Sequence, residues 1–256
     1  MRKSWIGIII FSVISCANAK EKDPCKNPEY AKVKKEQVQM DVHRNDLYAA
    51  LNNILEAKRC NPKDPEVYYW LSKIYLFRQE IGKSKENIEL AIQYNPKYSD
   101  ANLLRGDIYL VENNLEEALK SYQKASSDDL FREAYIAWND IGWIFLLQDK
   151  LPEAENALNR SMALNSGFCN PHTNLGELRS KQKKYPEAVK ELQQAIQLCP
   201  YLPRAHRLLG LEYNRQGKTK EACSEFNQAL RNATPESDEA KSSSQYLKLL
   251  NCSSQK

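Results

Sequence analysis

Two consecutive stretches of 34 residues decide the fold: CNPHTNLGELRSKQKKYPEAVKELQQAIQLCPYL (169–202) and PRAHRLLGLEYNRQGKTKEACSEFNQALRNATPE (203–236). They align without a gap and carry the same small or apolar residues at equivalent places: Leu175-Gly176 and Leu209-Gly210, Ala188 and Ala222, Ala195 and Ala229. Self-similarity at a fixed period indicates one structural unit that is used repeatedly.

The same register runs back through most of the chain in three series of small residues. The first has intervals of 34, 36, 34 and 34: Ser72, Gly106, Gly142, Gly176 and Gly210. The second has intervals of 34, 34, 36, 34 and 34: Ala50, Ser84, Ala118, Ala154, Ala188 and Ala222. The third repeats those intervals: Ala57, Ala91, Ala125, Ser161, Ala195 and Ala229. Unrelated amphipathic helices would not produce three series in phase.

This pattern resembles the tetratricopeptide repeat (TPR), in which small residues let two antiparallel helices, A and B, approach closely. Pro62, Pro96 and Pro200 follow the expected B helices and end them. The resemblance implies an all-α, right-handed superhelix of about six TPR helix pairs over residues 31–235, with repeats beginning near 31, 65, 99, 135, 169 and 203. Residues 236–256 are expected to form a capping helix and tail.

The first repeat fits the TPR pattern least well. Helix A lacks the usual alternation of bulky and small residues and has instead Lys34, Gln37, Val38 and Asp41. Because a terminal repeat has only one neighbour, we expect this helix to be frayed.

Composition supports a helical, folded chain. The 256 residues are 42% apolar and 27% charged, and they include only 8 glycines, which disfavours disorder, a polytopic membrane protein and an all-β fold. The formal net charge is +4, too weak a bias for a nucleic-acid footprint.

The first residues are typical of an export signal. Arg2 and Lys3 precede an apolar run too short to span a bilayer. Val13-Ile14-Ser15-Cys16 resembles a bacterial lipobox, which predicts a signal peptide at 1–15, a diacylated Cys16 and a polar tether over 16–30. Ala17 follows Cys16, and by resemblance to Gram-negative lipoproteins the lack of Asp at that place implies sorting to the outer membrane, facing the periplasm. Alternatively, Ala17-Asn18-Ala19 fits an ordinary leader-peptidase cleavage site. Cleavage there would give a periplasmic or secreted protein without a lipid.

Six cysteines remain after Cys16, and an even number in an exported chain indicates disulfides, although six allow fifteen pairings. The repeat register places the members of three pairs at the same end of a helix hairpin: Cys25 with Cys60, Cys169 with Cys199, and Cys223 with Cys252. The alternative is six reduced, half-buried thiols.

No catalytic or cofactor-binding motif is present, so we expect neither an enzyme nor a cofactor. A metal site has one candidate set of residues: Cys169, His172, Cys199 and His206 could bring four zinc ligands together. An oxidising compartment favours a disulfide over that site, so no metal is predicted.

By TPR resemblance, a protein partner binds the concave face formed by the A helices. The predicted groove residues are Tyr69, Trp70, Phe77, Leu104, Asn139, Trp143, Leu147, Asn174, Arg204 and Arg207. They describe an apolar trough in repeats two to four and a polar, basic end in repeats five and six, and we expect about half of the apolar set to be core. Chaperone-binding TPRs hold the C-terminal carboxylate of their partner with a clamp of Lys, Asn, Asn, Lys and Arg from three successive repeats. In this chain only Asn174 and Arg204 match residues of that clamp.

Three features are similar to the TPR lipoproteins of type IV pilus biogenesis, the pilotins: the lipobox, the two extra residues between repeats three and four, and KASSDDLFREAYIAWNDIG (124–142). The resemblance implies a monomeric, lipid-anchored factor that helps the pilus secretin assemble in the outer membrane. Two other hypotheses stay open: a lipoprotein scaffold that recruits peptidoglycan hydrolases, and a secreted adaptor.

Overall fold

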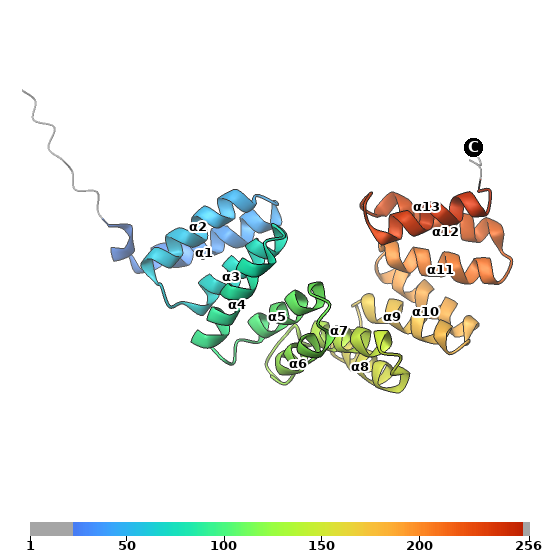
Figure 1. Cartoon of the computed structure of the whole chain (residues 1–256), viewed down its shortest axis with the longest axis horizontal. Helices are drawn as coiled ribbons and strands as arrows, with labels where there is room; N and C mark the ends of the chain where they lie inside the picture. Colours follow the sequence, from blue (N-terminus) through green and yellow to red (C-terminus); the bar gives the residue numbers. More distant parts are fainter. Residues whose placement is uncertain (1–22, 253–256) are drawn as a thin grey trace, which may run out of the picture.

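The computed structural model describes residues 23–252, which form an arc of stacked helices (Figure 1). A short 3-10 helix, η1 (Pro24–Lys26), precedes thirteen α-helices in this part of the chain, and no strand occurs there. The helices are α1 (Pro28–His43), α2 (Leu47–Cys60), α3 (Pro65–Phe77), α4 (Ile81–Tyr94), α5 (Ser99–Val111), α6 (Leu115–Ser126), α7 (Ala134–Leu147), α8 (Leu151–Leu164), α9 (Asn170–Lys181), α10 (Tyr185–Leu198), α11 (Pro203–Arg215), α12 (Thr219–Asn232) and α13 (Asp238–Leu249).

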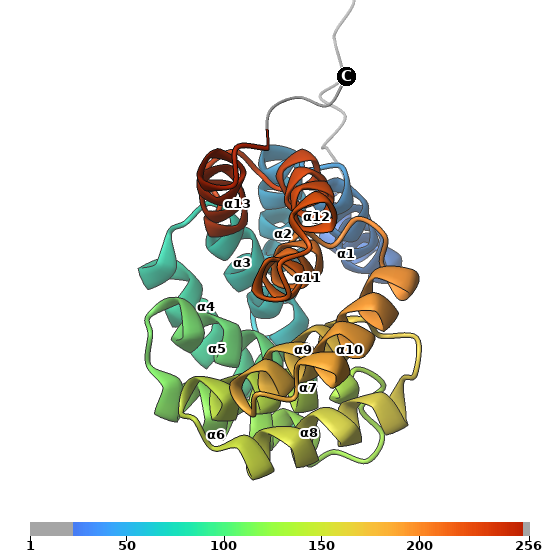
Figure 2. The same ribbon diagram turned by 90° about the vertical axis from the view of Figure 1, so that its right-hand side faces the viewer.

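Each odd-numbered helix from α1 to α11 packs against the helix that follows it, and α13 covers α12. Helices α3, α5 and α11 begin at the predicted repeat starts, and α7 and α9 begin within one residue of them. Figure 2 shows that successive pairs also turn in the third dimension, so the arc is superhelical. The prediction of an all-α superhelix of six helix pairs and a capping helix is therefore confirmed.

The small residues of the first series lie where a large B-helix side chain crosses helix A. A Cβ on Gly142 would lie 2.7 Å from the Leu158 side chain, and one on Gly210 would lie 2.8 Å from Phe226. Gly106 faces the fully buried Tyr122 ring still more closely. In repeat two, Ser72 replaces glycine and its Oγ is 3.0 Å from that of Ser84, so a hydrogen bond joins the two helices there.

The A–B turns also follow the repeat register. One residue in each turn has a positive φ, between 56° and 71°: Asn45, Gln79, Asn113, Asp149, Lys183 and Gly217. The backbone then closes on the end of helix A, as when Glu80 N–H donates to the Tyr75 carbonyl at 2.9 Å. This left-handed closure is a common way to satisfy the last carbonyls of a helix.

The first repeat is well formed, so the expectation of fraying was wrong. Helix α1 has 16 residues, and Val38 is fully buried. Lys35 reaches into the second repeat and pairs with Asp64 at 2.9 Å and with Glu66. These contacts between repeats replace the missing consensus residues.

The predicted tether boundary also needs correction. Helix α1 begins at Pro28, and the Asn27 side chain accepts from the Glu29 N–H. Residues 23–30 of the predicted tether therefore form η1, the first turn of α1 and the residues that cap them. The leader, Cys16 and the rest of the tether lie outside the described residues.

Three disulfides join the pairs that the repeat register indicates. Their Cα–Cα distances are 4.9 Å for Cys25–Cys60, 6.0 Å for Cys169–Cys199 and 5.7 Å for Cys223–Cys252. The last of them ties α12 to the end of the capping helix, where Phe226 stacks on Tyr246 at 5.0 Å between ring centroids. In the chain-entropy model, closing loops of this length contributes roughly 3 to 4 kcal/mol each.

We predict that non-reducing peptide mapping of the exported protein will recover these three pairs. Reduction should lower the thermal unfolding midpoint, because the unfolded chain regains the entropy of three open loops. Free thiols at all six positions, or a different pairing, would contradict this assignment.

The close crossing of helices A and B predicts how glycine substitutions change the stability of the protein. Gly106→Ala should destabilise the protein by about 1 to 3 kcal/mol, because the added methyl group collides with Tyr122. Gly82→Ala is the matched control: nothing lies within 4 Å of its Cβ position in α4, so it should be stabilising by about 0.5 to 1 kcal/mol. Urea unfolding of both variants measures the difference, and equal effects would contradict the packing argument.

Candidate functional site

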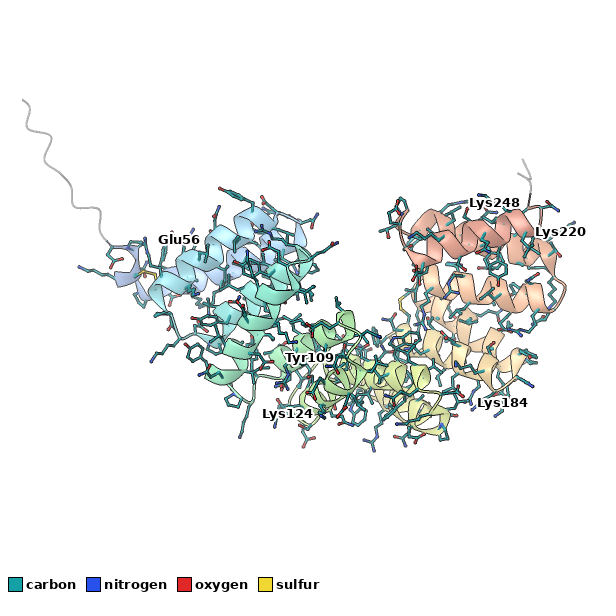
Figure 3. The ribbon with its side chains drawn as sticks, viewed as in Figure 1. Glu56, Tyr109, Lys124, Lys184, Lys220 and Lys248 are labelled. Carbon is teal, nitrogen blue, oxygen red and sulfur yellow. A yellow bond between two sulfur atoms is a disulfide. The ribbon has the colours of Figure 1, made fainter. Side chains whose placement is uncertain are left out.

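The A helices form the inner side of the arc. In Figure 1, α3, α5, α7 and α9 lie nearer the opening than their B-helix partners. In the C-terminal half, Lys184, Lys220 and Lys248 lie on the outer side, away from the opening (Figure 3). The candidate site is therefore the concave surface of the A helices.

The predicted apolar trough is only partly exposed. Leu104, a predicted groove residue, is only 6% exposed, so that prediction is wrong: it belongs to the core together with Leu103 and Leu146. The large apolar side chains that remain on the surface are the last residues of α3, α5 and α7: Phe77, Val111 and Leu147, exposed by 55%, 61% and 48%. The apolar part of the site is thus an edge made by equivalent positions of three repeats.

Aromatic side chains occupy the concave side of repeats two and three. The ring centroids of Tyr69 and Trp70 are 5.3 Å apart, and those of Tyr69 and Tyr98 are 5.4 Å apart. The Lys73 ammonium lies 5.3 Å from the Trp70 ring and 5.7 Å from the Tyr69 ring. All three aromatic residues are partly buried.

A chain of hydrogen bonds runs along the concave side of repeats four to six. Arg204 donates to Asn174 Oδ1 at 2.6 Å, Asn174 donates to Asn139 Oδ1 at 2.9 Å, and Asn139 donates to Asp140 Oδ1 at 2.9 Å. Asn139 and Asn174 are only 4% and 2% exposed. These two predicted groove residues therefore bind each other across α7 and α9, and they are not free for a ligand.

Arg204 is also engaged within the protein. It pairs with Glu177 at 2.6 Å, and its guanidinium lies 4.1 Å from the Trp143 ring centroid. Such stacking and paired hydrogen bonding suit the planar guanidinium. The structure thus brings Trp143, Asn174 and Arg204 together, and they connect repeats four, five and six. Because Asn174 and Arg204 bind other side chains of the protein, they do not form a free carboxylate clamp.

Arg207 has a different position. No hydrogen bond or ion pair to it occurs within residues 23–252, and it borders a hollow of about 500 Å³ between α7, α9, α11 and the start of α13. The hollow is lined by Asn139, Asp140, Trp143, Asn170, Thr173, Asn174, Leu202, Arg204, Arg207, Asp238 and Glu239. The capping helix, whose first turn carries two carboxylates, thus contributes to the site as well as closing the stack.

Sequence reasoning missed three concave carboxylates. Asp100 and Asp107 come from α5 and Asp140 from α7. Burial raises the pKa of Asp107 to about 6, against the effect of a hydrogen bond from the Tyr122 hydroxyl at 2.8 Å. Burial, together with the negative charge of Asp107, raises the pKa of Asp140 to about 7. Each stands at the repeat position of a predicted groove residue, and that register could have identified them: Asp100 corresponds to Arg204, Asp107 to Trp143 and Asp140 to Trp70.

The four side chains considered as zinc ligands have other partners. Cys169 and Cys199 form a disulfide. His172 Nδ1 lies 2.7 Å from Glu191, and His206 Nδ1 lies 2.7 Å from Glu225. Among residues 23–252, no group of three or more His, Cys, Asp or Glu side chains is placed to hold a metal ion, and no helix is long and apolar enough to cross a membrane.

Comparison with known proteins identifies the repeat. The family described as "Tetratricopeptide repeat" matches residues 71–129 and 103–167, and that described as "TPR repeat" matches 178–217. The BBSome complex member BBS4 of Xenopus tropicalis is 36% identical over 77 residues, which are 30% of this chain and span only 15% of that protein.

Two solved structures share the arrangement of helices. Pseudomonas aeruginosa PilF is 18% identical, with a TM-score of 0.72 over 84% of this chain and 96% of that one. PilW, described as a widely conserved type IV pilus biogenesis factor, is 20% identical, with a TM-score of 0.71 over 82% of this chain and 96% of that one. At these identities, the likeness establishes a common fold.

We predict that Asp140→Asn will stabilise the protein at high pH. Because folding raises the pKa of this carboxyl, the folded state binds its proton more readily than the unfolded chain does, and stability falls as pH rises from about 4 to about 8. The amide removes that cost, which is on the order of 4 kcal/mol above about pH 8 and declines toward pH 4.

Urea unfolding at several pH values tests this prediction. Asp129→Asn, at an exposed loop position, is the control and should follow the wild-type pH dependence. An Asp140→Asn curve that runs parallel to wild type from pH 4 to pH 8 would show that Asp140 is solvated.

Proposed function

Because the chain is built of tetratricopeptide repeats, we propose that it is a protein-binding scaffold of type IV pilus biogenesis, which holds a secretin subunit at the outer membrane. The observation that carries this proposal is the likeness to PilF and PilW over 96% of each of those chains. A domain that shared only isolated repeats with them would not match from end to end. The role needs no catalysis by the chain itself.

The proposed mechanism separates anchoring from binding. A lipid on Cys16 attaches the chain to the outer membrane, and the polar residues before η1 give the superhelix reach into the periplasm. The concave surface then holds an exposed segment of one secretin subunit until neighbouring subunits displace it. An anchored binding site raises the local concentration of its partner, which favours ring assembly at the membrane.

The apolar edge is the part of the site best suited to a test of partner binding. Phe77 is 55% exposed, so its removal changes the surface with little effect on the core. Trp143, in contrast, is partly buried and stacks on Arg204, so its removal affects binding and stability together. A scaffold that recruits peptidoglycan hydrolases would use the same surface and remains the alternative.

We predict that Cys16→Ser will release the protein from the outer membrane. Ser12→Ala, outside the lipobox, is the control and should fractionate like wild type. The fraction of protein that pellets with outer membrane is measured by immunoblot. Wild-type pelleting of the Cys16 variant would overturn the lipid anchor and favour a periplasmic or secreted adaptor.

We predict that mild crosslinking in the native host, followed by affinity purification and mass spectrometry, will recover the pilus secretin. Phe77→Ala should reduce its recovery, corresponding to about 1 to 3 kcal/mol of binding, with an unchanged unfolding midpoint. The exposed Tyr201→Ala, outside the concave edge, is the control. Recovery of peptidoglycan hydrolases without secretin would support the alternative.

A further inference from the structure

The concave side of repeats two to four carries an acidic and aromatic patch, which consists of Tyr69, Trp70, Tyr98, Asp100, Asp107 and Asp140. Each of these residues keeps part of its surface exposed. The three rings contact one another in series, with Tyr69 in the middle. The carboxylates come from the next two A helices, so the patch runs across α3, α5 and α7.

The negative charges of the patch exceed the positive charges that face them. Burial is the largest cause of the raised pKa of the Tyr69 hydroxyl, and the negative charges of Asp100, Glu133, Asp107 and Glu66 raise it further. Lys73 is the cation whose charge reaches Asp100 and Asp107. Within residues 23–252, no ion pair within 4.0 Å reaches any of the three aspartates of the patch.

Asp140 is held in place by buried neighbours. Its Oδ1 accepts from Asn139, which is 4% exposed and is fixed in turn by Asn174. No hydrogen bond to Oδ2 occurs within the described residues. A carboxylate that is oriented by a buried amide and has a free oxygen is prepared for an additional donor, because less side-chain entropy is lost when that donor binds.

Lys73 shows which kind of group the rings accept. Its ammonium lies within 6 Å of the centroids of both Trp70 and Tyr69, the range in which an aromatic face attracts a cation. The same surface that already carries one ammonium has two further acidic side chains, Asp107 and Asp140, that form no ion pair within 4.0 Å in the described part of the chain.

We propose that the patch binds a lysine- or arginine-bearing segment of the protein partner, with the cationic side chain between Asp107 and Asp140 and the neighbouring carbon atoms on Trp70 and Tyr98. This inference rests on the proposed function as a scaffold and specifies the chemistry of its partner. The excess of carboxylates disfavours an acidic peptide or an anionic lipid surface at this place. The spread of the patch over three A helices favours an extended segment rather than a single side chain.

A set of matched peptides tests the proposal with the full mature chain. Each is about 12 residues long, enough to cross three A helices when extended, and is capped at both ends. The peptides differ only in their central residue, which is Lys, Gln or Glu. Binding is measured at about pH 8, above the pKa of both Asp107 and Asp140, by calorimetry and by the fluorescence of the tryptophans. The Lys peptide should bind about five- to tenfold more tightly than the Gln peptide, and added salt should reduce this difference.

Two variants locate the binding. Asp107→Asn with Asp140→Asn should abolish the preference for Lys over Gln, while the amide at 107 can still accept from the Tyr122 hydroxyl. Glu153→Gln, at an exposed position on the B helix α8, is the matched control and should keep the preference. Circular dichroism and unfolding midpoints confirm that the variants are folded.

Equal binding of the three peptides, tighter binding of the Glu peptide, or no binding at all would overturn the patch as a cation site. Its failure can be told apart from failure of the scaffold role. If the double variant recovers secretin from the host like wild type, the scaffold role stands and the patch does not contribute. If the Lys peptide binds selectively but no secretin is recovered, the patch is supported and the pilus assignment fails.

Discussion

The close crossing of helix A and helix B within each repeat is the constraint on which the rest of the structure depends. A large B-helix side chain, such as Tyr122 or Phe226, packs directly on the backbone of helix A, and only glycine or a small residue leaves room for it. This contact fixes the separation of the two helices and therefore how the next pair can stack. The side chains that face the concave surface are placed by that geometry.

Tyr122 connects the core of repeat three to its concave surface. The Tyr122 ring, from α6, packs against Gly106 of α5. The hydroxyl at the far end of the ring donates to Asp107, which follows Gly106 in α5. The residue that fills the helix crossing thus also orients a concave carboxylate. A similar role is played by Asn139 and Asn174, which are buried between A helices and hold Asp140. Rigid elements of this kind position a binding surface more accurately than loops do.

The repeat register made the fold predictable from sequence, and the concave surface less so. Glycine and alanine spacings report helix crossings within a repeat, so helix starts and cysteine pairs followed from local geometry. Exposure depends on the neighbouring repeat: Leu104 and Asp140 share a repeat position, but Leu104 is core and Asp140 is partly exposed. The Lys35 pairs with Asp64 and Glu66 also cross between repeats, which is why the first repeat looked weaker in sequence than it is in structure.

The arrangement of charge gives the concave surface a direction. The hydrogen-bond chain from Arg204 through Asn174 and Asn139 ends at Asp140, so the same network that joins repeats four to six also joins the basic end to the acidic patch. Arg204 is satisfied by Glu177 and Trp143, so Arg207 is the arginine of the hollow that has no ion pair among the described residues, and the carboxylates of Asp238 and Glu239 on α13 line the same hollow. Asp140 also lines this hollow, so a segment whose basic residue lies against Asp140 would meet a surface of mixed charge beside it, and its specificity would depend on matching both signs of charge.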